Sequence, residues 1–197
     1  VGDAGVVDQH VDPPEPLDDG RREPGHGRLV AHVADRGERH AVDRLAVERG
    51  ALMAGLAGDG VMLSVEADAA RLAAALAHHT EVSIAAYNTP DSVVLSGERA
   101  AVQAVCAELG VSGKALRVSH AFHSDQMEPM LDPFEAVLSR VPLAPPRLPL
   151  ISGLSGARAG EELATASYWR RQVREPVRFH SAVRAAHREG CSVFLEV

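Results

Sequence analysis

The spacing of apolar positions changes several times along the chain, and each change marks the border of an expected element. Between residues 61 and 119, short apolar runs alternate with Ala- and Leu-rich stretches that have helical spacing. These patterns predict four strands and two helices in the order β-α-β-β-α-β: Val61–Val65, Ala67–Ala77, Val82–Tyr87, Ser92–Ser96, Glu98–Leu109 and Ala115–Ser119. A turn is expected at Asn88–Asp91 and a helix end at Gly110. This order is typical of a ferredoxin-like unit, so the pattern predicts an α/β fold.

Longer helical patterns flank this unit. One covers Ala41–Leu56, and another covers about Gln126–Arg140, with Ser124 or Asp125 as its N-cap. Towards the C-terminus the pattern predicts a strand at 148–152, helices at 166–173 and 176–190, and a buried strand at 192–197. Phe179 is expected to point inward from the helix at 176–190, together with Val177, Val183 and Ala186. We interpret the adjacent Tyr168 and Trp169 as core residues.

The first 44 residues differ in composition from the rest. They contain no Ser, Thr, Asn, Lys, Ile, Met, Cys or aromatic residue, and two charged clusters lie within a proline-bounded loop at 13–24. Such a segment buries little apolar surface, so we expect loose coil or disorder there.

Two histidines three residues apart, His120 and His123, lie between the predicted strand at 115–119 and the helix at 126–140. A loop on a fixed scaffold presents side chains to a substrate, and an imidazole accepts and returns a proton near neutral pH. The alternative is that one of them is a loop histidine packed on its neighbours. A metal pair is disfavoured because no Cys or third His lies nearby in the sequence.

The overall composition excludes several classes of partner. A net charge of −7 without any basic run argues against a nucleic-acid partner. No apolar run approaches the roughly 20 residues that span a bilayer, and the N-terminus lacks the pattern of a signal peptide. Two cysteines, Cys106 and Cys191, indicate no disulfide framework, so we expect a cytoplasmic location.

The sequence around the histidines, RVSHAFHSDQMEPML (117–131), closely resembles that of the acyltransferase domains of modular type I polyketide synthases. The resemblance runs from about Leu45 to Val197. It includes ERGALM (48–53), VSIAAYNTPDSVVLSGE (82–98), YWRRQVREPVRF (168–179) and the terminal FLEV. Several long strings in the same order make a specific signal.

This resemblance implies a partial α/β-hydrolase-like body with an inserted ferredoxin-like small subdomain. The atypical segment would be 1–44, the large subdomain 45–60 and 120–197, and the small subdomain 61–119. In the family Gly-Pro follows the strand at 192–197, so the resemblance implies that the large subdomain is truncated.

The resemblance also implies a chemistry, which is ping-pong acyl transfer. A serine takes a malonyl group from malonyl-CoA, and the phosphopantetheine thiol of an acyl carrier protein receives it. His123 would be the catalytic base and Arg49 would bind the free malonyl carboxylate. His120 and Phe122 would shape a pocket that prefers malonyl over methylmalonyl units. No bound cofactor or metal is implied, and a neighbouring ketosynthase domain is the second expected partner.

The chain departs from the family pattern at the nucleophile. Where a Gly-His-Ser-x-Gly elbow is expected, the nearest string is Gly25-His26-Gly27-Arg28-Leu29, and no Gly-x-Ser-x-Gly occurs elsewhere. We therefore expect this polypeptide to be inactive in acyl transfer. A shifted reading frame or a mispredicted start over the first 44 residues is our hypothesis for the difference.

Two other functions remain open at this stage. The chain is a non-catalytic ferredoxin-like binding or docking module, or it is a hydrolase that pairs His123 with Ser119 or Ser124. The malonyl-CoA transacylase of fatty-acid synthesis is a close variant of the first interpretation.

Overall fold

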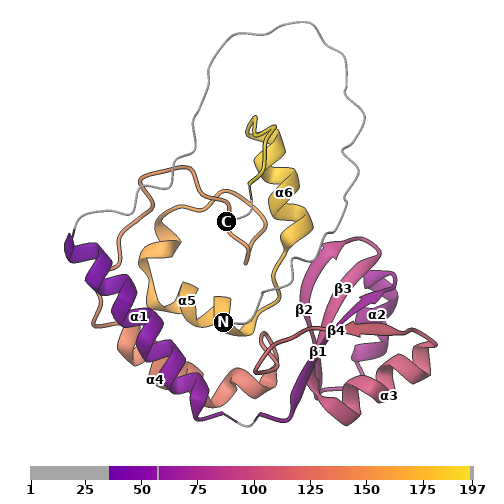
Figure 1. Ribbon diagram of the computed structural model, residues 1–197. Coiled ribbons are helices and arrows are strands. Elements are labelled where there is room, and N and C mark those ends of the chain that lie inside the picture. Colours follow the sequence, from indigo (N-terminus) through magenta and orange to yellow (C-terminus); the bar gives the residue numbers. More distant parts are fainter. Residues whose placement is uncertain (1–35, 57, 196–197) are drawn as a thin grey trace, which may run out of the picture. The chain divides into compact units, whose positions relative to one another are not determined.

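A computed structural model describes residues 36–56 and 58–195, with side chains from residue 45 onward. Its one sheet has four antiparallel strands in the order β2-β3-β1-β4 (Figure 1). The strands are β1 (Gly60–Glu66), β2 (Val82–Thr89), β3 (Ser92–Glu98) and β4 (Gly113–Ala115). Helices α2 (Ala69–Leu76) and α3 (Arg99–Leu109) fall between them, which gives the expected element order.

Local signals in the sequence account for the ends of these elements. The Asp68 side chain caps α2 by accepting a hydrogen bond from the Arg71 N–H at 2.7 Å. Gly110 ends α3 in the left-handed conformation with φ 65°, which favours glycine. Pro90 and Asp91 make the turn between β2 and β3. The predicted helix end at Gly110 is confirmed by its left-handed conformation.

The two faces of the sheet carry different cores. One face packs against α2 and α3 through a cluster whose central members have no exposed surface: Val65, Leu72, Val93, Leu95, Val102 and Val105. The opposite face carries a smaller cluster of Met62, Ala85 and Val94, against which Leu116 and Phe122 pack. The histidine loop thus lies over this second face of the sheet.

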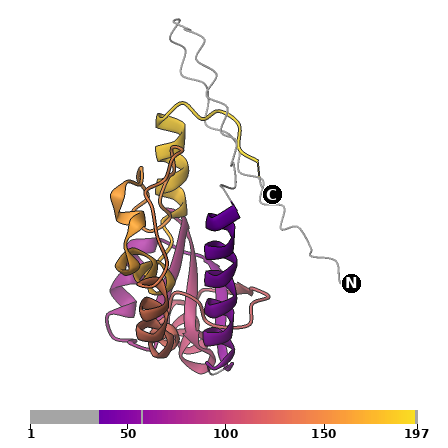
Figure 2. The same ribbon diagram turned by 90° about the vertical axis from the view of Figure 1, so that its left-hand side faces the viewer.

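Helices α1 (Arg36–Ala54), α4 (Glu128–Leu138) and α5 (Ala166–Arg174) form a second region, while α6 (Phe179–Arg188) follows α5 in the chain and packs near β2. Helix α1 packs on α4, and α4 packs on α5. Figure 2 shows α1, in indigo, as one continuous helix. The shared core contains Met127, Met130, Leu131, Phe134, Leu138 and Val173. Two arginines of α5 join α4 and the 3₁₀ turn η1 (Asp125–Met127) from outside: Arg170 pairs with Asp132 and Glu135, and Arg174 with Asp125 and Glu128.

Three predicted elements differ at the C-terminal end. Residues 148–152 form no strand but one isolated bridge, Ile151 to Arg158. The last helix, α6 (Phe179–Arg188), is shorter than predicted, and Phe179 is 53% exposed rather than inward. The described part of the segment 192–197 is also not a strand, and Leu195 is 86% exposed. A strand needs a neighbouring strand for its backbone hydrogen bonds, and the described residues bring none beside this segment.

Two other predicted boundaries differ from the structure. The strand predicted at 115–119 is wrong for most of its length, because β4 ends at Ala115 and the last hydrogen bond to β1 comes from the Leu116 N–H. Helix α1 begins at Arg36, five residues before the predicted Ala41, so part of the segment expected to be loose is helical. The rest of that segment, 1–35, lies outside the described residues.

Tyr168 and Trp169 pack edge to face with their ring centroids 5.3 Å apart, as expected of core residues.

A short 3₁₀ turn, η2 (Glu161–Ala164), completes the helical region, and Leu163, Leu154, Ala159 and Tyr168 form a small cluster around it. Within the described ranges, no helix is both long and apolar enough to cross a membrane.

Candidate functional site

His123 lies in the loop that leads from the sheet to α4. Its backbone adopts φ 58°, the left-handed region, which histidine enters more readily than most non-glycine residues. Ser124 follows and caps η1 by accepting a hydrogen bond from the Gln126 N–H at 3.3 Å. The Ser124 hydroxyl also donates to the Ala121 carbonyl at 2.6 Å. The chain therefore reverses direction at His123 and is held immediately after it.

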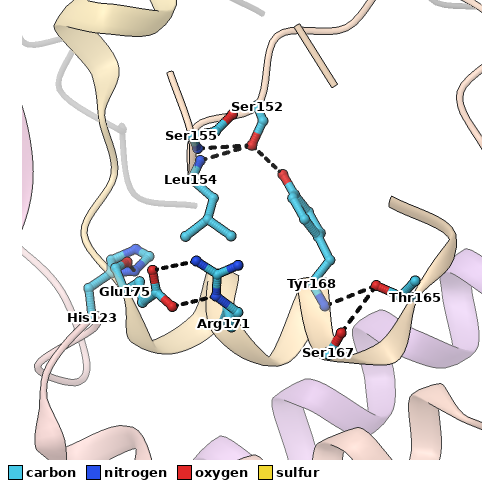
Figure 3. A network of polar contacts seen from close by, with 9 residues as sticks. All are labelled: His123, Ser152, Leu154, Ser155, Thr165, Ser167, Tyr168, Arg171 and Glu175. Carbon is cyan, nitrogen blue, oxygen red and sulfur yellow. Dashed lines mark hydrogen bonds and ion pairs between the residues drawn. The ribbon is translucent and has the colours of Figure 1, made fainter. Parts of the chain in front are cut away.

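The carbonyl of Glu175 fixes the orientation of the His123 ring. Nδ1 of His123 lies 2.9 Å from the Glu175 carbonyl oxygen. A carbonyl only accepts, so Nδ1 carries the proton, and Nε2 of the neutral ring has a free lone pair. The Glu175 carboxylate is held by Arg171, with Nε to Oε1 at 2.6 Å and Nη2 to Oε2 at 3.1 Å (Figure 3).

The surroundings keep the His123 ring neutral. Its burial is the main cause of a pKa below the ordinary value, and the positive charge of Arg49 lowers the pKa further. Hydrogen bonds to the backbone at Glu175 and Gln172 oppose this shift. A neutral imidazole with a free Nε2 is the form that accepts a proton from an attacking hydroxyl or thiol.

Arg49 reaches the same neighbourhood from α1. Its side chain is half-buried, and its Nε is a buried atom without a hydrogen-bond partner among the described residues. Leaving a buried donor unpaired costs about 1–3 kcal/mol, and no described residue pairs with this N–H to offset that cost. Since its charge acts on His123, Arg49 lies within electrostatic range of the ring.

The other two predicted residues lie beside His123 on the loop. The rings of His120 and Phe122 are 6.1 Å apart at their centroids and tilted by 60°. Phe122 packs against both the core of the helical region and the second face of the sheet, so its ring is held from two sides. Nδ1 of His120 makes a local contact with the Ser119 hydroxyl at 2.9 Å.

The hydroxyls near His123 do not form a nucleophile–base pair with it. Ser119 contacts His120, and Ser124 is 1% exposed with its hydrogen bond directed to the Ala121 carbonyl. Ser152 is also buried, and its hydroxyl bonds to Tyr168 at 2.6 Å and to two backbone N–H groups (Figure 3). These contacts disfavour the hydrolase interpretation. In the described part of the chain, no three His, Cys, Asp or Glu side chains form a possible metal site.

Sequence reasoning missed the roles of Glu175 and Ser152. Glu175 acts on His123 through its backbone carbonyl, 52 residues away, and any residue type supplies that group. Ser152 stands in the string SGLSG (152–156), which lacks the spacing of a Gly-x-Ser-x-Gly elbow. The hydroxyl instead holds the loop through the N–H groups of Leu154 and Ser155.

Comparison with known proteins gives consistent matches. Residues 31–197 match the family described as the acyl transferase domain. Over 159 residues the chain is 46% identical to the polyketide synthase GfsA of Streptomyces halstedii, covering 78% of this chain and 2% of that protein. The chain therefore spans a small part of this relative. The family match begins before Leu45, where the resemblance was expected to start.

The solved structures that are similar to the chain include the following two. The acyltransferase domain from the second module of the salinomycin polyketide synthase matches with a TM-score of 0.72 and 41% identity, covering 77% of this chain and 37% of that one. An acyl carrier protein S-malonyltransferase from Vibrio cholerae matches with a TM-score of 0.66 and 27% identity, covering 75% of this chain and 51% of that one.

Proposed function

The chain belongs to the acyl transferase domain family, and we propose that its site serves the transfer of a malonyl-type unit from CoA to an acyl carrier protein. The observation that carries the proposal is the pair of Arg49 and His123. The charge of Arg49, whose buried Nε has no partner among the described residues, acts on a neutral imidazole whose Nδ1 is held by the Glu175 carbonyl. These are the two groups that a malonyl thioester requires beside the nucleophile.

The roles of the two residues follow from their chemistry. Arg49 donates to the free carboxylate of the malonyl group, because a guanidinium offers parallel N–H groups that match a carboxylate. Where a nucleophilic serine is present, His123 would accept the proton of its hydroxyl at Nε2 and return it to the leaving thiolate of CoA. The Vibrio cholerae relative, which is an acyl carrier protein S-malonyltransferase, supports this choice of acyl group and acceptor.

Phe122 and His120 would form the wall of the acyl pocket. Because Phe122 is packed on two clusters, its ring has little freedom to move away from an α-methyl group. One methyl group in a pocket discriminates by about 1–3 kcal/mol. We therefore expect a preference for malonyl over methylmalonyl thioesters rather than complete exclusion.

The fold supports a matching division of the chain. We infer that the sheet with α2 and α3 is a ferredoxin-like small subdomain, because the element order and the strand order β2-β3-β1-β4 fit one. The helical region would then belong to a larger α/β-hydrolase-like body. The phosphopantetheine arm of a carrier protein would approach His123, and a ketosynthase would be a neighbouring domain.

This polypeptide would bind the thioester without forming an acyl-enzyme. No Gly-x-Ser-x-Gly elbow occurs in its sequence, and the serines beside His123 are engaged elsewhere. A base without a nucleophile transfers no acyl group.

Calorimetric titration with malonyl-CoA and acetyl-CoA tests the proposal. The two thioesters differ in the carboxylate, and a charge-assisted hydrogen bond contributes about 1.5–3 kcal/mol, so we expect malonyl-CoA to bind on the order of 10–100-fold more tightly. Arg49→Met should abolish that difference. Arg184→Met, at an exposed arginine of α6, is the matched control and should leave the difference intact.

Equal binding of both thioesters to the parent protein would contradict the proposal and favour a non-catalytic docking module. Incubation with labelled malonyl-CoA is a second test. We expect no covalent label on the protein, and a stable label would show that a nucleophile is present.

A further inference from the structure

We propose that Val177 and Arg178 are positioning residues for His123. The connection between α5 and α6 forms a hydrogen bond to the His123 ring and also pairs with the edge strand of the sheet. The connection runs through Glu175, Pro176, Val177 and Arg178. The carbonyl of Glu175 accepts the hydrogen bond from Nδ1 of His123, and Val177 pairs with β2. The inference rests on the proposed role of His123 as the base.

The pairing with β2 uses the open edge of the sheet. β2 is an edge strand, and its register with β3 is irregular between Ile84 and Ala86. On its outer side, the Val177 N–H donates to the Ala85 carbonyl at 2.8 Å, and the Tyr87 N–H donates to the Val177 carbonyl at 2.8 Å. Val177 thus adds a short parallel bridge to the strand and satisfies backbone groups that would otherwise be open.

Arg178 links the connection to two other segments, the loop at Gly153 and strand β2. Its N–H donates to the Gly153 carbonyl at 2.7 Å, which links the connection to the loop held by the Ser152 hydroxyl. Its guanidinium lies 5.8 Å from the ring centroid of Tyr87 on β2, a cation–π geometry. The connection is therefore attached to the sheet through both its backbone and a side chain.

These attachments determine where the Glu175 carbonyl points. Only Pro176, whose φ is restricted by its ring, separates Glu175 from Val177. A shift of Val177 is therefore transmitted to Glu175 with little possibility of compensation. Since a displacement of about 1 Å is enough to disturb a reactive geometry, loss of the β2 bridge should release the His123 ring.

The ring nitrogens of His123 report this release directly. In ¹⁵N-labelled protein, chemical shifts of the two nitrogens identify the tautomer, and His123→Gln assigns the signals. We expect the parent to show one dominant Nδ1–H form above the pKa. Val177→Pro removes the N–H that donates to Ala85, so the Nε2–H form should appear and the single-tautomer signal should be lost. Val177→Ala keeps that N–H and should resemble the parent.

Arg178 provides a second variant if Val177→Pro does not fold. Arg178→Ala should raise the fraction of the Nε2–H form, Arg178→Lys should restore the parent spectrum by keeping a cation over Tyr87, and Arg184→Ala should have no effect. The proposal is overturned if Arg178→Ala matches Arg184→Ala, if Val177→Pro folds and retains the parent tautomer, or if Val177→Ala loses it equally. The spectra are recorded without a thioester, so a failure of malonyl-CoA binding leaves this test unaffected.

Discussion

The sheet region, residues 60–115, and the helical region around α1, α4, α5 and α6 are stabilised in different ways. The sheet region has a continuous core in which Val65, Val93 and Leu95 have no exposed surface, and its strands are joined by hydrogen-bond ladders, of which the one between β1 and β3 is regular. The helical region has smaller clusters, ion pairs between half-buried arginines of α5 and exposed carboxylates of α4, and exposed apolar residues at its C-terminal end.

The difference follows from which elements are neighbours in the sequence. β2 and β3 form a hairpin, and α2 and α3 each cover the strands beside them in the chain. In the helical region, α1 packs on α4, and a long stretch of sequence separates these two helices. Its contacts therefore form only when parts of the chain that are distant in sequence come together. The candidate site lies where the two regions meet, since Phe122 packs on clusters of both.

The largest expected effect comes from opening the core of the sheet region. Leu95→Ala removes a side chain without exposed surface, so the free energy of unfolding should fall by about 2–5 kcal/mol. Urea unfolding followed by circular dichroism measures it. Leu148→Ala, at a residue that is 42% exposed, should cost much less, and equal losses would contradict the contrast between the regions.

A smaller effect is expected from the ion pairs of the helical region. Arg174 contacts Asp125 and Glu128, whose side chains are 49% and 53% exposed, so the pairs are screened by solvent. Arg174→Met should lower the free energy of unfolding by about 1 kcal/mol or less, and the loss should shrink in ~1 M salt. A loss that does not depend on salt would mean that packing of the Arg174 stem matters more than its charge.

The pH dependence of stability should carry a contribution from His123. Its folded pKa lies below the unfolded value of 6.5, so the unfolded chain binds the proton more readily. This contribution is fully present above pH ~6.5 and is lost as the pH falls towards the folded pKa. His123→Gln should flatten the decrease in unfolding free energy between pH ~7 and ~5, whereas an unchanged profile would show that the ring is not buried.

The smallest perturbation is chemical labelling of the two thiols, which compares the regions without altering either core. Cys106 is buried beside the sheet, and its burial raises the pKa of the thiol. Cys191 follows α6 and is half-exposed. Iodoacetamide should therefore modify Cys191 first, as measured by mass spectrometry of the digested protein. Faster modification of Cys106 would indicate that the sheet region opens more easily than the helical region.

The sequence predicted the sheet region well because its information is local. Alternating apolar runs, the Asp68 cap and Gly110 each determine an element boundary within a few residues. The strands predicted at 148–152 and in the described part of 192–197 are wrong, because an apolar run becomes a strand only beside another strand, which no local pattern reveals.

The candidate site was predictable only in part. The roles of the His-Ala-Phe-His string and Arg49 come from the resemblance, and the structure shows that the charge of Arg49 acts on His123. The carbonyl of Glu175 was not predictable because a backbone acceptor leaves no mark on residue type. Its partner Val177 was expected inside a helix, whereas it bridges to β2.

The most direct test of a shared site for Arg49 and His123 is the pKa of His123, measured by NMR with and without malonyl-CoA. Arg49 lowers this pKa, so Arg49→Met should raise it in the free protein. Binding of the malonyl carboxylate should neutralise Arg49 and raise the pKa in the parent, whereas acetyl-CoA should not. A pKa that is unchanged by both Arg49→Met and malonyl-CoA would contradict the account.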